Sequence, residues 1–317
     1  MKKIKKISIV IIMLISLFSI FSNTYVNASE INLTKSANNE KENDLLESDY
    51  IMMYDAKTGV TSKVDMKKVL KQNLIKSKNI KTNYTNGYSP EVNALDKNII
   101  LSSSSSTERV YPTQSPYNKA FKCVFYSNNN ERGDASGAIV GLRVGLTAAH
   151  CIFNENDNNA VFKNWTCYVG YDSGNYWGTP TGWDKVYYDS RYFDNHDKRY
   201  DWAILVLQAD STVGWFGVQS YGSTSDLNNM DITMLGYPAD SNLGFNGAYE
   251  YRVTSKAGLS VFTDIIRFNG LGASGFSGGP IYNSSEYIVA VMCSGDNQYC
   301  YAPRITSNMI EIIKSLK

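Results

Sequence analysis

The stretch Gly275-Phe276-Ser277-Gly278-Gly279-Pro280 decides how this chain is interpreted. Three glycines surround a single serine, and glycine lets the backbone turn sharply and lets another molecule approach it closely. Such a turn can present the serine hydroxyl beside backbone N–H groups, which is what a nucleophile and its oxyanion hole require. The same letters are also typical of a glycine-rich turn in an all-β protein. The rest of the chain has to distinguish the two interpretations.

Composition sets the first limits. The chain has 317 residues, is 43% hydrophobic and carries a formal net charge of +1. This hydrophobic content is enough for a core and excludes global disorder, and the charge gives no electrostatic case for nucleic acid or acidic lipid as a partner. The 23 tyrosines and 23 glycines favour β architecture.

Residues 1–28 have the pattern of a secretory signal peptide. Four lysines within residues 2–6 precede an apolar run from Ile7 to Phe21, and a cut is expected after Ala28. The run is short for a membrane span, although an uncleaved anchor is the alternative. We therefore expect a secreted, extracellular protein with no stable membrane association after signal cleavage.

The next segment predicts a small, weakly hydrophobic unit. Residues 29 to about 50 are polar and predict a disordered leader. Residues 50–54 predict a strand, and Asp65 is expected to cap a helix whose lysines face solvent. The apolar positions of this helix are Met66, Val69, Leu70 and Leu74.

This N-terminal part has a marginal core and is followed by a serine run at residues 102–106. We therefore expect a propeptide over residues 29–98, removed by a maturation protease that cuts within about residues 97–101. The alternative is a small accessory domain that the protein retains.

From about Arg109 onward, short apolar or aromatic runs alternate with turn residues, and no βαβ alternation is present. This spacing predicts an all-β sandwich or barrel. The runs cover residues 120–126, 138–144, 166–171, 185–188, 202–207, 231–235, 249–253, 265–268 and 287–292. The last element is a predicted helix with an apolar stripe from Met309 to Leu316, started by a capping-box pattern at Asn308 and Glu311.

Only two histidines are present. His150 follows an apolar run among small residues, where it could act as a general base in a cleft. Asp201 begins another apolar run, where a buried carboxylate needs a hydrogen-bond donor, and a histidine Nδ1–H would supply one. His196 lies in a charged segment and is expected to be solvated. Asp194 and Asp197 are rival acids, but neither begins an apolar strand.

Chain order separates two classes of hydrolase. The letters around Ser277 also fit the G-x-S-x-G elbow of α/β-hydrolases, but that class needs its histidine after the serine, and none follows. The order His150, Asp201, Ser277 is that of chymotrypsin-like proteases. A metal site is not expected, because the two histidines lack ligand spacing.

Three segments resemble the signature segments of chymotrypsin-fold serine proteases: residues 147–151, 201–205 and 275–280. More narrowly, the chain resembles the secreted bacterial glutamyl endopeptidase (V8-like) branch, to which residues 235–238 and 304–306 are similar. The resemblance runs from about Arg109 to the C-terminus.

The resemblance implies two six-stranded antiparallel β-barrels with a C-terminal α-helix over residues 99–317. It implies that Ser277 attacks the peptide carbonyl, that His150 transfers the proton and that Asp201 orients His150. The backbone N–H groups of Gly275 and Ser277 would form the oxyanion hole. The implied activity is that of a serine endopeptidase that cleaves protein or peptide substrates through an acyl-enzyme and is made as a proenzyme.

The chain departs from the family in its activation switch and its substrate pocket. Phe276 stands where trypsin-like enzymes carry the aspartate that pairs with the new N-terminus, so that ion pair is excluded. The pocket is expected to involve Gly272, Met292, Ser294 and Gly295. Met292 and Gly272 replace a histidine and a hydroxyl residue that hold a glutamate substrate, so glutamate specificity should be weakened or lost in favour of a small residue.

The five cysteines are an odd number, so at least one thiol stays unpaired or pairs between chains. A Cys293–Cys300 bridge is our first expectation, and burial of both as small apolar groups is the alternative. Cys151 lacks the partner that animal relatives provide, which leaves Cys123 and Cys167 as candidates.

We expect no cofactor. Residues 154–159 carry oxygen ligands that could bind structural calcium, but a plain surface loop is the favoured interpretation because EF-hand spacing is missing. A catalytically silent homologue that acts as a secreted binding module is the alternative function. Retention of the serine, histidine and aspartate favours the enzyme, which we expect to be a monomer.

Overall fold

The structure is a computed structural model that describes residues 48–76, 82–90, 106–260, 262 and 264–317. The predicted signal peptide, most of the polar leader and the expected cut region lie outside these residues. All described residues belong to one unit of the chain, Asp44–Lys317. Within them, no helix has the length and apolar character needed to cross a bilayer.

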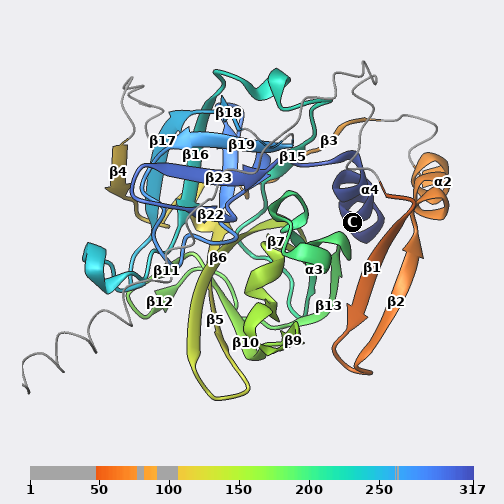
Figure 1. The fold of residues 1–317 in the computed structure, drawn as a ribbon, viewed down its shortest axis with the longest axis horizontal. Coiled ribbons are helices and arrows are strands. Elements are labelled where there is room, and N and C mark those ends of the chain that lie inside the picture. The colour runs from red at the N-terminus through yellow and green to blue at the C-terminus, as the bar shows by residue number, and fades with distance from the viewer. Residues whose placement is uncertain (1–47, 77–81, 91–105, 261, 263) are drawn as a thin grey trace, which may run out of the picture. The chain divides into compact units, whose positions relative to one another are not determined.

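The first barrel is built from six antiparallel strands (Figure 1). In spatial order they are β10 (Lys163–Val169), β5 (Ala120–Tyr126), β6 (Arg132–Gly141), β7 (Val144–Thr147), β14 (Ala203–Leu207) and β13 (Trp183–Tyr188). A bridge between Cys167 and Thr181, with N···O distances of 2.8 and 3.0 Å, links β10 to the residues just before β13. The hairpin β1 (Tyr50–Asp55) and β2 (Val60–Asp65) extends this sheet beyond β13.

The second barrel is divided between a seven-stranded and a four-stranded sheet. The first contains, in order, β3 (Tyr84–Thr85), β15 (Gly217–Gln219), β21 (Tyr287–Val291), β20 (Pro280–Asn283), β16 (Asp231–Gly236), β17 (Tyr251–Lys256) and β4 (Ser106–Arg109). The second contains β18 (Gly258–Leu259), β19 (Ile265–Asn269), β23 (Tyr299–Pro303) and β22 (Ser294–Gly295). A bridge between Ala290 and Arg304 joins the two sheets, and β15 with β21 is the one parallel pair among the described strands.

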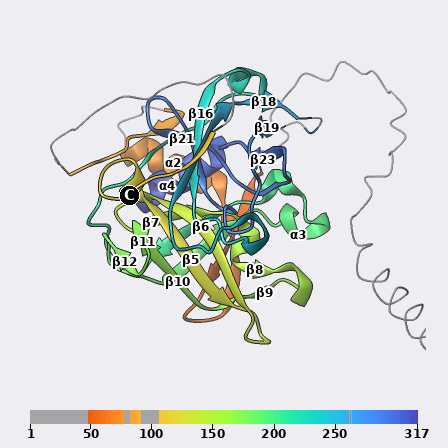
Figure 2. The same cartoon turned by 90° about the vertical axis from the view of Figure 1, so that its left-hand side faces the viewer.

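Short elements complete the described part of the chain (Figures 1 and 2). The small ladders are β8 (Phe153–Asn154) with β9 (Ala160–Val161) and β11 (Tyr171–Asp172) with β12 (Asn175–Tyr176). The α-helices are α2 (Met66–Lys76), α3 (Arg191–Asn195) and α4 (Ser307–Leu316). The 3₁₀ helices are η1 (Tyr117–Lys119), η2 (Ala149–Cys151), η3 (Glu155–Asp157), η4 (Lys198–Tyr200), η5 (Ser225–Leu227) and η6 (Ser241–Leu243).

The fold class predicted from the sequence is confirmed: the chain is mostly β, with two barrels and a C-terminal helix. Each predicted strand has a counterpart, but residues 138–144 divide into β6 and β7, because the chain reverses between Gly141 and Val144. The helix α2 begins after Asp65, whose Oδ1 accepts from the N–H groups of Lys67 and Lys68 at 2.9 and 3.3 Å, as predicted.

The expected cap of the C-terminal helix was wrong. The cap of α4 is Thr306, whose Oγ1 accepts from Met309 N at 3.3 Å, whereas Asn308 donates to Ser48 O at 2.8 Å. The N-terminal part, which was expected to have only a marginal core, packs its apolar residues onto the first barrel. Its side chains Ile51, Met66 and Val69 are 1%, 6% and 8% exposed and belong to the same hydrophobic cluster as the first barrel.

Candidate active site

His150 lies in η2, directly after β7 and within a run of small residues. Ala148 and Ala149 are fully buried, so the backbone here packs closely and leaves the imidazole as the group that reaches outward, 25% exposed. The Nδ1 atom of His150 is 2.7 Å from Asp201 Oδ2, and its backbone N–H donates to Asp201 Oδ1 at 3.0 Å. The structure therefore brings together two of the predicted site residues across 51 positions of sequence.

Asp201 follows η4 and precedes β14, and its side chain is only 4% exposed. Both of its oxygens accept a hydrogen bond from His150, so the cost of burying the carboxylate is offset locally. An ionised carboxylate can only accept, so the proton of a neutral His150 sits on Nδ1. Nε2 is then the nitrogen left to take a proton from another group.

The surroundings of His150 also set its basicity. Burial opposes the charged imidazolium, but the Asp201 carboxylate outweighs it, so that the pKa of His150 is raised well above its ordinary value of 6.5. A raised pKa makes the imidazole a stronger proton acceptor. It also means that the neutral form, which a general base requires, is populated only at higher pH.

The turn around Ser277 depends on Gly275. Gly275 has φ of 90°, and a β-carbon there would lie 2.4 Å from Tyr237 O. The carbonyl of Ser274 accepts from Ala239 N at 2.7 Å. Because the peptide is planar and trans, the Gly275 N–H points away from that contact. Phe276 is fully buried in the core of the second barrel.

Ser136, which the sequence did not single out, connects the two barrels at this turn. It lies on β6 and is fully buried. Its Oγ donates to Gly275 O at 2.6 Å and accepts from Tyr237 N at 2.8 Å. Its backbone N–H donates to Ser277 O at 2.8 Å. No local pattern could have revealed this role, because all three partners are more than 100 positions away.

The serine and histidine segments pack against each other. A β-carbon on Gly278 would lie 2.1 Å from Thr147 Oγ1 and 2.9 Å from Ala148 N, which shows how closely the two chains approach. Among the described contacts, no hydrogen bond joins Ser277 to His150. Such bonds in proteases often tighten only when substrate is present.

Cys293 is a buried thiol near the site. Burial, together with the charge of Asp201, raises the pKa of this thiol to about 12.

The predicted pocket residues also lie together, but they leave little space between them. Gly272 N–H donates to Asp296 O at 2.8 Å, and a β-carbon on Gly272 would lie 2.5 Å from Gly295 Cα. Met292 is 2% exposed, and its terminal methyl lies 3.2 Å from the position of a β-carbon on Gly295. Ser294 pairs with Tyr301 in the β22–β23 ladder. The backbones at Gly272 and Gly295 are therefore in direct contact, on opposite sides of the expected substrate pocket.

The rival acids and the second histidine lie elsewhere. His196 ends α3 with a 43% exposed side chain, and its Nδ1 is 3.4 Å from Glu155 Oε1. Asp197 is bound to Arg199 at 2.6 Å, and Asp194 is exposed. In the 154–159 loop, Glu155 also contacts Tyr192. The part of the chain that the structure describes contains no cluster of three or more metal-binding side chains.

The expectation of a Cys293–Cys300 bridge was wrong, since all five cysteines are free and buried. The ladder register places Cys300 opposite Gly295 rather than Cys293, whose Sγ donates to Tyr301 O at 3.2 Å. Cys123 lies opposite Cys167 in the β5–β10 pair, and neither is bonded to Cys151.

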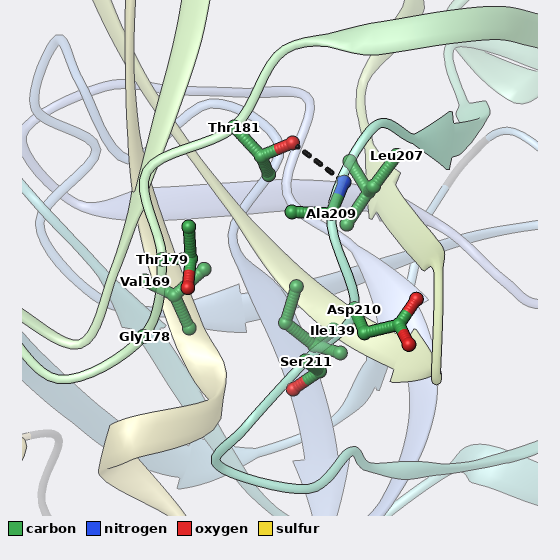
Figure 3. A pocket seen from close by; sticks show the side chains of 9 residues that line it. All are labelled: Ile139, Val169, Gly178, Thr179, Thr181, Leu207, Ala209, Asp210 and Ser211. Carbon is green, nitrogen blue, oxygen red and sulfur yellow. Dashed lines mark hydrogen bonds between the residues drawn. The ribbon is translucent and has the colours of Figure 1, made fainter.

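A separate small pocket lies in the first barrel and contains none of the candidate catalytic residues (Figure 3). Ile139 and Leu207 form part of its apolar lining, and at its rim Ala209 N donates to Thr181 Oγ1 at 3.0 Å. It is therefore not part of the His150 and Ser277 site.

Residues 135–291 match the family model described as a trypsin-like peptidase domain. This segment includes His150, Asp201 and Ser277. The matched segment, just under half of the chain, is therefore similar to a trypsin-like peptidase domain. The protein is an enzyme of the serine endopeptidase class, as the sequence predicts, while no curated protein matches it closely enough to add detail.

Solved structures show the same fold. The protease Anisep from Arthrobacter nicotinovorans is 21% identical with a TM-score of 0.52, and the match covers 63% of this chain and 93% of that one. A Glu endopeptidase is 18% identical with a TM-score of 0.57, covering 68% and 97%. The thermostable serine protease AL20, from an extremophilic microorganism, is 16% identical with a TM-score of 0.50, covering 61% and 93%.

Proposed function

We propose that this trypsin-like peptidase cleaves peptide bonds with His150, Asp201 and Ser277 as its catalytic triad. The observation that carries the proposal is the double hydrogen bond from His150 to the buried Asp201 carboxylate. It fixes the imidazole so that Nε2 is the nitrogen left to take a proton, and the residues just before His150 pack against Gly278, the neighbour of Ser277. The narrower resemblance to the glutamyl endopeptidase (V8-like) branch is part of this proposal.

The reaction follows from these positions. Ser277 Oγ attacks the scissile carbonyl while its proton moves to His150 Nε2, and Asp201 stabilises the imidazolium that forms. The backbone N–H groups of Gly275 and Ser277 receive the negative charge on the carbonyl oxygen. The imidazolium then protonates the leaving amine, which leaves an acyl-enzyme. Water hydrolyses this ester by the same sequence of steps and regenerates Ser277.

The substrate residue before the cut bond is small in this proposal. The contact between Gly272 and Gly295 gives a long side chain no space between these walls, and Met292 offers a thioether rather than a cation. A buried substrate carboxylate would lack a partner there. Digestion of a peptide library by the mature enzyme tests this proposal, and dominant cleavage after glutamate would contradict it.

The proposal extends to the location and maturation of the protein. The protein is secreted, monomeric and made as a proenzyme that a maturation protease cuts within about residues 97–101. Its partners are protein or peptide substrates, not nucleic acid or membrane, and it uses no cofactor. The catalytically silent binding module is not favoured, because a binder has no need for the His150–Asp201 pair.

Covalent labelling tests the triad directly. A fluorophosphonate probe should label the matured protein, and Ser277→Ala should abolish the label because the attacking oxygen is gone. Ser285→Ala, at an exposed serine in the turn between β20 and β21, is the matched control and should label normally. Absence of label on correctly matured protein would refute the proposal.

A further inference from the structure

The N-terminal segment, defined here as residues 48–76 and 82–90, is built into both barrels. Strand β1 pairs with the outer edge of β13 over four residue pairs, from Met52 opposite Tyr188 to Asp55 opposite Lys185. Strand β3 pairs with β15, so that Val218 lies opposite Thr85. One segment therefore continues the sheet of the first barrel and the larger sheet of the second.

Helix α4 carries a row of polar side chains that hold this segment. Asn308, Glu311 and Lys314 are spaced by three residues and so lie along one side of the helix. Asn308 Nδ2 donates to Ser48 O at 2.8 Å, and Lys314 Nζ donates to Thr82 O at 2.5 Å. Figure 1 shows α2 alongside α4, with the β1–β2 hairpin below it.

The central contact of this row is buried. Asn73 of α2 is 5% exposed and Glu311 is 6% exposed. Asn73 Nδ2 donates both to Glu311 O and to Glu311 Oε2, each at 2.8 Å. Removal of the segment would take this partner from Glu311. It would also uncover the apolar contacts of Ile51, Met66 and Val69 with the first barrel.

The end of the segment is fixed in the same way. Tyr88 and Trp215 exchange two backbone hydrogen bonds of 2.8 Å, and their rings lie 4.8 Å apart. Trp215 Nε1 donates to Asn86 O at 3.2 Å. None of the hydrogen bonds from the described N-terminal residues reaches His150, Asp201 or the 275–277 turn. The hydrogen bonds that hold the segment are therefore separate from the catalytic residues.

We propose that the N-terminal segment remains bound to the protease as a non-covalent subunit after the chain is cut between residues 91 and 105. It is then a permanent part of the folded enzyme, not a propeptide that is discarded. This inference rests on the proposed function in one respect, namely that the natural protein is cut as a proenzyme. The segment adds the β1–β2 hairpin to the sheet of the first barrel, β3 to the larger sheet of the second barrel and an amide to Glu311. Loss of the segment would leave the edge of β13 open to pairing with other chains.

The test separates retention from activity. In the Ser277→Ala variant, the recognition sequence of a site-specific viral protease is inserted within residues 91–105, and the folded protein is cut with that protease. Native size exclusion with mass spectrometry should show both fragments eluting together at the mass of the uncut chain, and separating only in denaturant. Release of the N-terminal fragment, whether the remainder stays in solution or precipitates, would overturn the proposal. The inactive variant makes this result independent of the labelling test of the triad.

A pair of neighbouring substitutions tests the contact that holds the segment. Asn73→Leu removes both donors to Glu311 and should raise the dissociation rate of the cut complex by roughly 10- to 100-fold. Gln72→Leu changes the exposed neighbour on the same helix and should leave the rate within about twofold, since surface substitutions away from such contacts have small effects. Equal rates for the two variants would contradict the assigned role of Asn73.

Discussion

Replacing Ser136 with alanine removes one hydroxyl that serves two buried backbone groups at the junction of the barrels. The hydroxyl donates to Gly275 O at 2.6 Å and accepts from Tyr237 N at 2.8 Å, and Ser136 is fully buried, so water cannot replace it without rearrangement. Each buried group left without a partner costs about 1–3 kcal/mol. The two together predict a loss of about 2–6 kcal/mol in the free energy of unfolding, or roughly 5–15 °C in Tm.

The same change should slow catalysis. With its carbonyl released, Gly275 loses one of the contacts that hold the oxyanion turn. Complete loss of one oxyanion donor costs about 3 kcal/mol. We expect part of that, a decrease in kcat of roughly 10- to 100-fold with KM within about threefold, because the interaction matters in the transition state. The assay is steady-state hydrolysis of a peptide substrate by matured protein, with Tm measured on the same sample.

Ser127→Ala provides the matched control. Ser127 is 7% exposed, and its hydroxyl accepts from Asn129 N at 3.2 Å and Glu131 N at 3.1 Å, in the hairpin between β5 and β6. This variant should lower Tm but keep kcat, because its hydrogen bonds do not reach the site. An unchanged kcat in Ser136→Ala, or an equal loss of kcat in both variants, would refute the reasoning.

Three further outcomes are expected. Because the pKa of His150 is raised, kcat/KM should fall with decreasing pH along a limb whose midpoint lies above 6.5, and a midpoint below 6.5 would contradict this. Asp201→Asn should move that limb to lower pH and reduce kcat by roughly 10⁴-fold. Gly275→Ala should reduce kcat by roughly 100-fold or more, since its β-carbon would lie 2.4 Å from Tyr237 O, and a fully active variant would contradict the assigned turn. All five thiols should resist a thiol reagent in the native enzyme and react once it is denatured, whereas fewer than five after denaturation would reveal a disulfide.

The class of fold and the order of the candidate residues could be predicted from the sequence because both depend on local patterns. Strand β5 was expected over the residues where it is found, since apolar residues between turn signals need only neighbours in sequence to be recognised. Helix α2 starts after Asp65 as expected, because an N-cap acts within one turn. Likewise, the order of His150, Asp201 and Ser277 is a property of the chain and excluded the α/β-hydrolase class before any contact was known.

The tertiary structure decided what depends on distant residues. The sequence could not reveal that Ser136 holds the Gly275 turn, because the hydrogen-bond partners of its hydroxyl belong to the other barrel. Nor could it show that Thr306 rather than Asn308 caps α4, since the Asn308 side chain donates a hydrogen bond to Ser48 O instead. The N-terminal segment looked separable because its hydrophobic residues are too few for a core of its own. They complete the core of the protease instead, and only packing in three dimensions brings those two parts of the chain together.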